Sequence, residues 1–128
     1  MRVIIAGSRS FTDYELFKIF MATAMKEELN IEDIDEVVSG CAPGADTLGE
    51  RWAKENGIPV KRFPAHWDKY GMAAGPMRNA EMADYADFLI AFWHPLCRGT
   101  SNMIAKMQHA KKEYIRFEIP TTGIQTLR

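Results

Sequence analysis

The sequence predicts an α/β fold: a single doubly wound domain with a mainly parallel, five-stranded sheet and helices on both faces. Five short apolar runs rich in β-branched and aromatic residues occur along the 128 residues, and helical patterns separate most of them. The run from Phe88 to Phe92 is almost wholly apolar, as expected of a central strand covered on both sides. The length suits one compact domain, so we expect one unit over residues 1–128, with a core at about 2–118 and a tail at 119–128.

Each element has its own local signal. A first strand covers residues 2–6, and Asp13 is placed to cap a helix of about four turns in which Phe17 and Phe20 recur at helical spacing. Further strands are expected at 36–39, 60–63, 88–92 and 114–118. Helices are expected at 45–56, where Gly57 ends the helix, and at 100–111.

One long connection interrupts this alternation. Residues 64–76, PAHWDKYGMAAGP, link two predicted elements of a small domain. Connections of this length are commonly lids or binding loops. The alternative is a surface excursion that Trp67 and Tyr70 hold against the domain.

Composition and charge argue against several classes of protein. The 16 basic and 17 acidic side chains give a formal net charge of −1, which disfavours a general electrostatic grip on nucleic acid or an anionic membrane. No apolar run is long enough to span a bilayer, and Val3 to Ala6 is too short for a signal peptide. Cys41 and Cys97 are too few for a disulfide framework, so we expect a cytoplasmic protein with reduced thiols. No HxxxH pair is present, and we expect neither a metal nor a cofactor.

Glycine-containing turns follow three of the predicted strands and indicate the ligand site. VVSGCAPGAD, residues 37–46, carries Gly40 and Gly44 between a strand and a helix, while AGSR at 6–9 and RGT at 98–100 follow two other strands. Glycines let backbone N–H groups approach a phosphate, and a helix start favours negative charge. With a strand order of 3-2-1-4-5, the order reverses between the first and fourth strands, and a crevice there would gather all three turns.

The polar side chains of these turns suit a phosphorylated or nucleotide-derived ligand. Arginines can fork onto phosphate, and hydroxyl groups near helix starts can donate to it. The predicted ligand- and phosphate-binding residues are Gly7, Ser8, Arg9, Ser39, Gly40, Gly44, Asp46, Arg78, Gly99 and Thr100. Asp46 either accepts from a ribose hydroxyl or stabilises the first turn of its helix. Trp67 and Trp93 are candidates for stacking on a base, or else core or interface aromatics.

Several segments together resemble the YspA/YpsA-related branch of the SLOG superfamily. They are AGSRSFTD, VVSGCAPGAD, the stretch from Gly57 to Trp93, and RGTSNMI, in unbroken order over about residues 2–118. The resemblance implies a Rossmann-like fold and the binding, sensing or processing of a nucleotide or nucleotide-derived ligand.

One related group, the LOG-type phosphoribohydrolases, releases the base from a nucleoside monophosphate. Its RKxxM segment resembles Arg78-Asn79-Ala80-Glu81-Met82, and in its GGxGTxxE turn the catalytic glutamate corresponds to Met103 here. A thioether cannot transfer protons, so the resemblance disfavours LOG-type hydrolysis and leaves Arg78 and Glu81 as catalytic candidates.

A second related group, the DprA-type DNA-processing proteins, binds single-stranded DNA. It shares GSR, SGxAxGxD and an RN pair, which adds Asn79 to the predicted ligand-binding residues. Such binding needs a cationic track with interleaved aromatics. The near-neutral charge disfavours it, although Lys61, Arg62, Lys69 and Arg78 could make a small patch.

The sequence therefore predicts a cytoplasmic domain that binds or senses a nucleotide or nucleotide-derived phosphorylated ligand at the carboxyl ends of its strands. The alternatives are a nucleotide-processing, N-glycosidic hydrolase and DprA-like single-stranded nucleic-acid binding. The expected partners are a small molecule and a second copy of the chain, since the methionine-rich helices would allow a homo-oligomer. No membrane partner is expected.

Overall fold

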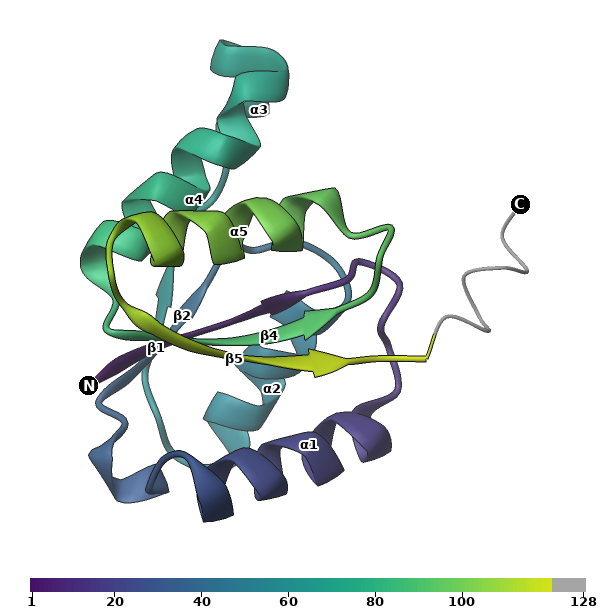
Figure 1. The fold of residues 1–128 in the computed structure, drawn as a ribbon, viewed down its shortest axis with the longest axis vertical. Coiled ribbons are helices and arrows are strands. Elements are labelled where there is room, and N and C mark those ends of the chain that lie inside the picture. The colour runs from purple at the N-terminus through teal and green to yellow at the C-terminus, as the bar shows by residue number, and fades with distance from the viewer. Residues whose placement is uncertain (121–128) are drawn as a thin grey trace.

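The computed structural model describes residues 1–120, which form a sheet between two layers of helices (Figure 1). The strands and α-helices are β1 (Arg2–Gly7), α1 (Tyr14–Glu27), β2 (Glu36–Ser39), α2 (Ala45–Glu55), β3 (Val60–Arg62), α3 (Trp67–Tyr70), α4 (Ala74–Tyr85), β4 (Phe88–Trp93), α5 (Arg98–His109) and β5 (Glu113–Glu118). The predicted tail lies mostly outside the described residues. Ile119 is nevertheless buried, and its N–H donates to the Trp93 carbonyl at 2.9 Å, so the packed chain continues past the predicted core.

The sheet confirms the predicted parallel, five-stranded architecture and has the strand order on which the predicted crevice depends. Its strand order is β3-β2-β1-β4-β5, and every neighbouring pair is parallel. The order reverses between β1 and β4, where Ile4 stands opposite Leu89 and Gly7 opposite Phe92. The carboxyl ends of these two strands therefore border the position at which an open α/β sheet binds its ligand.

Alternating side chains of the central strands supply two cores. Val3 and Ile5 of β1 pack with the buried faces of α1 and α2, whereas Ile4 and Ala6 pack with α4 and α5. Successive side chains of a strand point to opposite faces, which explains why these strands read as continuous apolar runs. Figure 1 shows the corresponding layers, with α1 and α2 below the sheet and α4 and α5 above it.

The first helix begins where the sequence predicts. The Asp13 side chain accepts a hydrogen bond from the Leu16 N–H at 3.1 Å and caps α1. Phe17, Met21 and Ala24 then repeat at helical spacing and are fully buried against the sheet.

The predicted long connection at 64–76 is wrong, because most of it is helical. Residues Trp67–Tyr70 form α3, Gly71–Ala73 form a turn of 3₁₀ helix, and α4 begins at Ala74. Pro76 is the third residue of α4, where its missing N–H has no acceptor inside the helix, so the proline is tolerated. Gly71, at φ +56°, changes the chain direction after α3.

The start of the last helix also differs from the prediction. Helix α5 begins at Arg98 and ends at His109, so Arg98, Gly99 and Thr100 form its first turn and not a separate glycine turn. The expected helix at 100–111 was therefore displaced by two residues at each end. Predicted and observed helix ends commonly differ by this much, because helix termini fray. Here the shift places the site residues Arg98, Gly99 and Thr100 on the helix itself.

Candidate functional site

A cavity of about 780 Å³ lies at the carboxyl ends of β1 and β4. Its walls come from the loop after β1, the start of α2, the α3 and α4 segments, the loop after β4 and the first turn of α5. Nine of the predicted site residues line it: Gly7, Ser8, Arg9, Asp46, Trp67, Arg78, Asn79, Gly99 and Thr100. Its volume falls in the range of small-molecule sites.

Five other predicted residues lie outside this lining: Ser39, Gly40, Gly44, Glu81 and Trp93. Ser39 is buried and donates to Glu50 of α2 at 2.6 Å, so its hydroxyl is already bonded within the protein. Glu81 is exposed on α4. Met103, which stands where the LOG-type glutamate would be, does line the cavity and is almost fully buried.

Gly40 and Gly44 shape the wall without opening onto it. Gly44 has φ +79°, and a Cβ there would stand 2.3 Å from the Ser8 carbonyl oxygen, so this glycine lets α2 begin directly against the loop after β1. A Cβ on Gly40 would stand 2.9 Å from both Arg78 Nη1 and Asp46 Oδ2. The glycines of VVSGCAPGAD thus bring two charged side chains and two loops close together.

Arg78 and Asp46 are the charged pair over Gly40. The Arg78 guanidinium donates from Nη1 to the Gly40 carbonyl and from Nε to Asn79 Oδ1 at 2.9 Å. Asp46 is 5% exposed, and its Oδ2 accepts from the Ala42 N–H at 3.2 Å. Burial raises the pKa of Asp46 to about 6, although the nearby Arg78 opposes the shift, and burial likewise lowers the pKa of Arg78.

Asn79 joins α4 to α5 at the cavity wall. Its Nδ2 donates to the Gly99 carbonyl at 3.2 Å and to Asn102 Oδ1 at 3.0 Å, while its Oδ1 accepts from Arg78. The side chain is 5% exposed, so its amide is occupied by protein partners. In this structure Asn79 positions Arg78 and the first turn of α5.

Ser8 and His94 meet on the floor of the cavity. Ser8 Oγ lies 3.0 Å from His94 Nε2, and His94 Nδ1 accepts from the Leu96 N–H at 3.1 Å. A neutral imidazole that accepts at Nδ1 carries its proton on Nε2, so His94 donates to Ser8. Burial lowers the pKa of His94 and favours this neutral form. The arrangement orients the serine hydroxyl but does not supply a base that would activate it.

Three arginines and one helix start make the cavity attractive to anions. Arg9, Arg78 and Arg98 line it, and Asp46 is the sole acidic residue among the described residues of its lining. Cys97, at the N-cap of α5, makes no side-chain capping bond. The Gly99 and Thr100 N–H groups in the first turn consequently have no acceptor within the helix.

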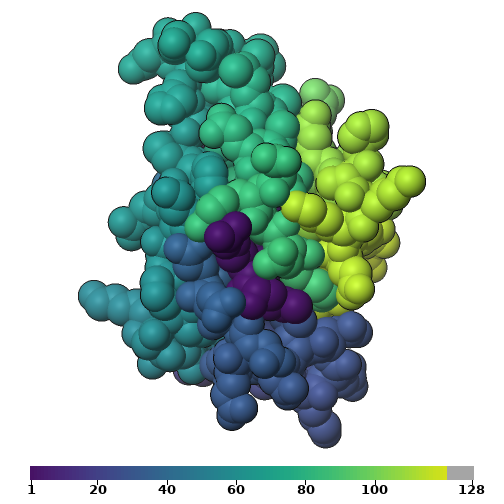
Figure 2. All heavy atoms as spheres, turned by 90° about the vertical axis from the view of Figure 1, so that its left-hand side faces the viewer, coloured from purple at the N-terminus to yellow at the C-terminus, as the bar shows by residue number. Residues whose placement is uncertain are grey.

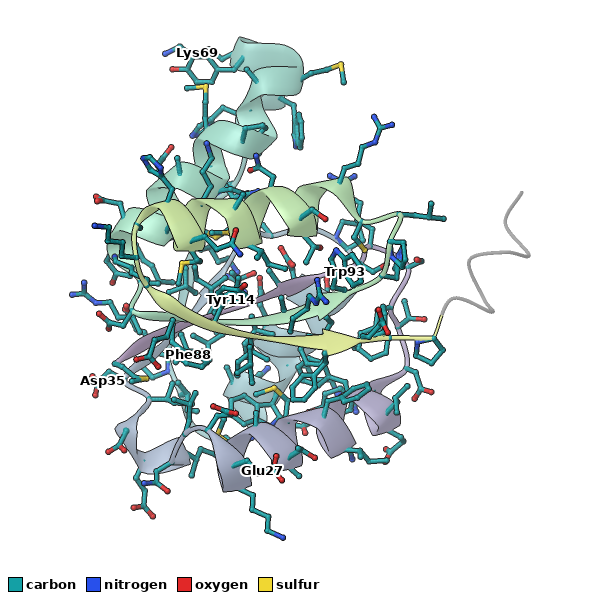
Figure 3. All side chains as sticks on the ribbon, in the orientation of Figure 1. Glu27, Asp35, Lys69, Phe88, Trp93 and Tyr114 are labelled. Atoms are coloured by element: carbon teal, nitrogen blue, oxygen red, sulfur yellow. The ribbon has the colours of Figure 1, made fainter. Side chains whose placement is uncertain are left out.

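The two candidate stacking residues lie in different places. Trp67 lines the cavity from α3, is 47% exposed, and has the Arg9 guanidinium 5.9 Å from its ring centroid. Trp93 lies at the end of β4 (Figure 3). It donates from Nε1 to Ser101 at 2.9 Å and has the Arg116 guanidinium 4.2 Å from its ring centroid. Trp67 therefore remains the candidate for covering a base.

The segment that carries Trp67 projects from the body of the protein. Figure 1 shows α3 beyond α4 and away from the sheet, and in Figure 2 the same teal segment forms the top of the molecule. Figure 3 places Lys69 near the far end of this segment. A Cβ on Gly75 would stand 3.1 Å from the Trp67 ring, so that glycine lets the ring lie close to the start of α4. The long segment between β3 and α4 thus reaches the site through one aromatic side chain.

Twelve lining residues were not among the predicted site residues, and they include the polar or charged Ser10, His94, Arg98 and Asn102. His94 and Arg98 follow the carboxyl end of β4, so their position after a switch-point strand was the available signal. Asn102 is recognisable only through its partner on α4, 23 residues earlier in the chain.

Other features bear on the class of site. Within residues 1–120, no group of three or more potential metal-ligating side chains gathers in one place, and Cys41 and Cys97 are free thiols. No helix in that part of the chain is sufficiently long and apolar to cross a membrane.

Comparison with known proteins gives three matches. The family model of the "YspA, cpYpsA-related SLOG family" matches residues 1–70. The Gene 61 protein of Mycobacterium phage D29 is 35% identical over 125 residues, which cover 91% of this chain and 95% of that protein. The X-ray structure of DNA processing protein A (DprA) from Streptococcus pneumoniae matches with a TM-score of 0.69 at 17% identity. That match covers 98% of this chain and 55% of DprA, and it shows a shared, Rossmann-like fold.

Proposed function

The chain belongs to the YspA, cpYpsA-related SLOG family, and on that premise we propose that its cavity binds a nucleotide or a nucleotide-derived phosphorylated ligand. Family membership and the likeness to DprA support a nucleotide- or nucleic-acid-related function. The observation that carries the finer proposal is the convergence of Arg9, Arg78 and Arg98 on one cavity beside the uncapped start of α5.

The phosphate and the base of such a ligand would each contact a different part of the cavity lining. Phosphate oxygens would accept from the arginines and from the Gly99 and Thr100 N–H groups. The exposed Trp67 at the mouth would cover a base by stacking, with Arg9 beside it. In this proposal the protein holds and senses the ligand.

Hydrolysis of the bond between base and ribose is the second candidate, and one observation favours it. The Asp46 carboxyl lines the cavity with a pKa raised to about 6 by burial, which suits a group that exchanges protons near neutral pH. Against it stand the buried Met103 at the LOG-type glutamate position and the proton-donating orientation of His94. Released base, measured by chromatography after incubation with nucleoside monophosphates, would establish this activity.

A thermal-shift panel of nucleoside mono-, di- and triphosphates tests the proposal. A ligand at 100 times its dissociation constant raises the free energy of unfolding by about 2.7 kcal/mol. Arg9→Ala should weaken the best hit about 10- to 100-fold, since a charge-assisted hydrogen bond contributes about 1.5–3 kcal/mol.

Arg116→Ala is the matched control, because Arg116 is also exposed and also lies over a tryptophan ring, but outside the cavity. It should leave the dissociation constant unchanged. If no phosphorylated compound in the panel stabilises the protein, the proposal fails.

A further inference from the structure

Asp46 is a buried carboxylate with acceptor capacity left over. It is 5% exposed, yet it lines the cavity. The Ala42 N–H donates to Oδ2, and the Gly7 N–H also stabilises the charge. A carboxylate has about four acceptor positions, so about two have no donor among the described residues.

The nearest cation does not fill them. Arg78 uses Nη1 for the Gly40 carbonyl and Nε for Asn79, and no ion pair joins its guanidinium to Asp46 within the described chain. The two groups nevertheless lie close together, since Arg78 Nη1 and Asp46 Oδ2 would each stand 2.9 Å from a Cβ on Gly40, and both residues line the cavity. A ligand group in the cavity that contacts both must donate to Asp46 and can accept from Arg78.

The need for a hydrogen-bond donor beside Asp46 distinguishes the sugar of a nucleotide from its phosphate. A phosphate dianion offers only acceptor oxygens and is repelled by a carboxylate, so it belongs near α5 and the exposed arginines. A sugar hydroxyl both donates and accepts, and a vicinal diol can donate to both oxygens of one carboxylate. Because a buried polar group left unpaired is costly, a site built for a hydroxyl rejects the analogue that lacks it.

We infer that Asp46 binds the ribose 2′,3′-diol of the ligand, so that the cavity selects ribonucleotides over their deoxy counterparts. The inference rests on the proposed function and names its substrate class. It also gives the carboxyl of VVSGCAPGAD a role at the ligand, beside its place in the first turn of α2.

The experiment measures dissociation constants by calorimetry for AMP, GMP, CMP and UMP, and for their 2′-deoxy and 3′-deoxy forms. For each ribonucleotide that binds, loss of either hydroxyl should weaken binding about 10- to 100-fold, as expected for a hydrogen bond to a charged group. In Asp46→Asn the amide oxygen still accepts from the Ala42 N–H, but an NH₂ group replaces the second acceptor. This variant should bind the ribo and deoxy forms within about twofold of one another.

The ratio of the ribo to deoxy dissociation constants is the decisive quantity, because removal of a carboxylate favours any anion. Inorganic phosphate measures that general effect. Asp68→Asn is the matched control, since Asp68 is likewise the second residue of a helix but is exposed and outside the lining; it should keep the wild-type ratio.

The outcomes are distinct. If ribo and deoxy forms bind wild type equally, or if Asp46→Asn keeps the discrimination, the inference is overturned while nucleotide binding stands. If none of the ribonucleotides or their deoxy forms binds, the proposed function is lost for nucleoside monophosphates and the inference falls with it.

Discussion

Replacing Asp46 by asparagine should stabilise the ligand-free protein, and the gain should depend on pH. Burial raises the pKa of Asp46 from 3.8 to about 6, against the attraction of Arg78 and with a small added repulsion from Glu50. Between those pH values the folded protein holds a proton that the unfolded chain has released. Stability therefore falls as pH rises through this window, and the full cost is present above pH 6.

The magnitude follows from the shift. A change of about 2 pKa units corresponds to about 3 kcal/mol, since each unit is 1.36 kcal/mol. Asparagine carries no charge, so its contribution does not change with pH. Measured as the difference between variant and wild type, the pH-dependent gain should be near zero at pH 3.5 and about 3 kcal/mol at pH 7.5.

Urea unfolding at half-unit steps from pH 3.5 to 8 measures this difference. Other titrating groups, among them His94 with its lowered pKa, are shared by both proteins and cancel in the subtraction. A difference that stays flat across the series, or grows toward acid pH, would refute the claim that this carboxylate is held at an electrostatic cost. A saturating ribonucleotide should reduce the difference in stability between Asp46→Asn and wild type, because the ribose hydroxyls then donate hydrogen bonds to the wild-type carboxylate.

Two further predictions concern the cavity wall. Gly44→Ala should lower the free energy of unfolding by at least about 2 kcal/mol, because the residue has φ +79° and the new Cβ would meet the Ser8 carbonyl oxygen at 2.3 Å. Gly99→Ala is the control and should lower it by less than about 0.5 kcal/mol, because the space around Gly99 is open. Denaturant midpoints measure both losses, and equal losses would contradict the packing described. Asn79→Ala should lower the free energy of unfolding by about 2 kcal/mol and speed amide hydrogen exchange in the first turn of α5, since it leaves Arg78 Nε and the Asn102 side chain unpaired. Asn102→Ala removes only one of these partners and should lower the free energy of unfolding by about half as much.

Local signals in the sequence predicted much of the fold. The parallel sheet followed from the apolar runs, and the crevice followed from the glycine turns once a strand order of 3-2-1-4-5 was assumed. Asp13 capped its helix as expected because an N-cap needs only residues three positions away. Helix α4 was missed because Gly75 and Pro76 occupy its first turn and the polar Asn79 sits on its buried face. The helical spacing of apolar residues in α4 is weak, and Gly75 and Pro76 instead favoured a loop in the sequence-based prediction.

The roles of individual site residues were harder to predict because their partners are distant in sequence. Gly40 makes room for Arg78, 38 residues later, and Ser8 meets His94 across 86 residues. Trp93 follows a switch-point strand as the cavity residues do, but its indole bonds to Ser101 outside the lining. The position of a residue in the sequence shows how near the carboxyl end of a strand its side chain lies. Whether that side chain faces the cavity depends on how the helices and strands pack together.

The distribution of charge favours a small ligand over a polynucleotide. A single-strand track needs cations that reach a continuous exposed backbone. Of the residues considered for such a patch, Arg62 is paired with Glu50 at 2.7 Å, and Arg78 is half-buried with its Nη1 and Nε already donating. A net charge of −1 is compatible with anion binding at a cavity that holds three arginines, because a phosphate placed there would respond to the groups within a few ångströms. Binding to this cavity should therefore retain most of its strength at salt concentrations that dissociate a backbone-tracking complex.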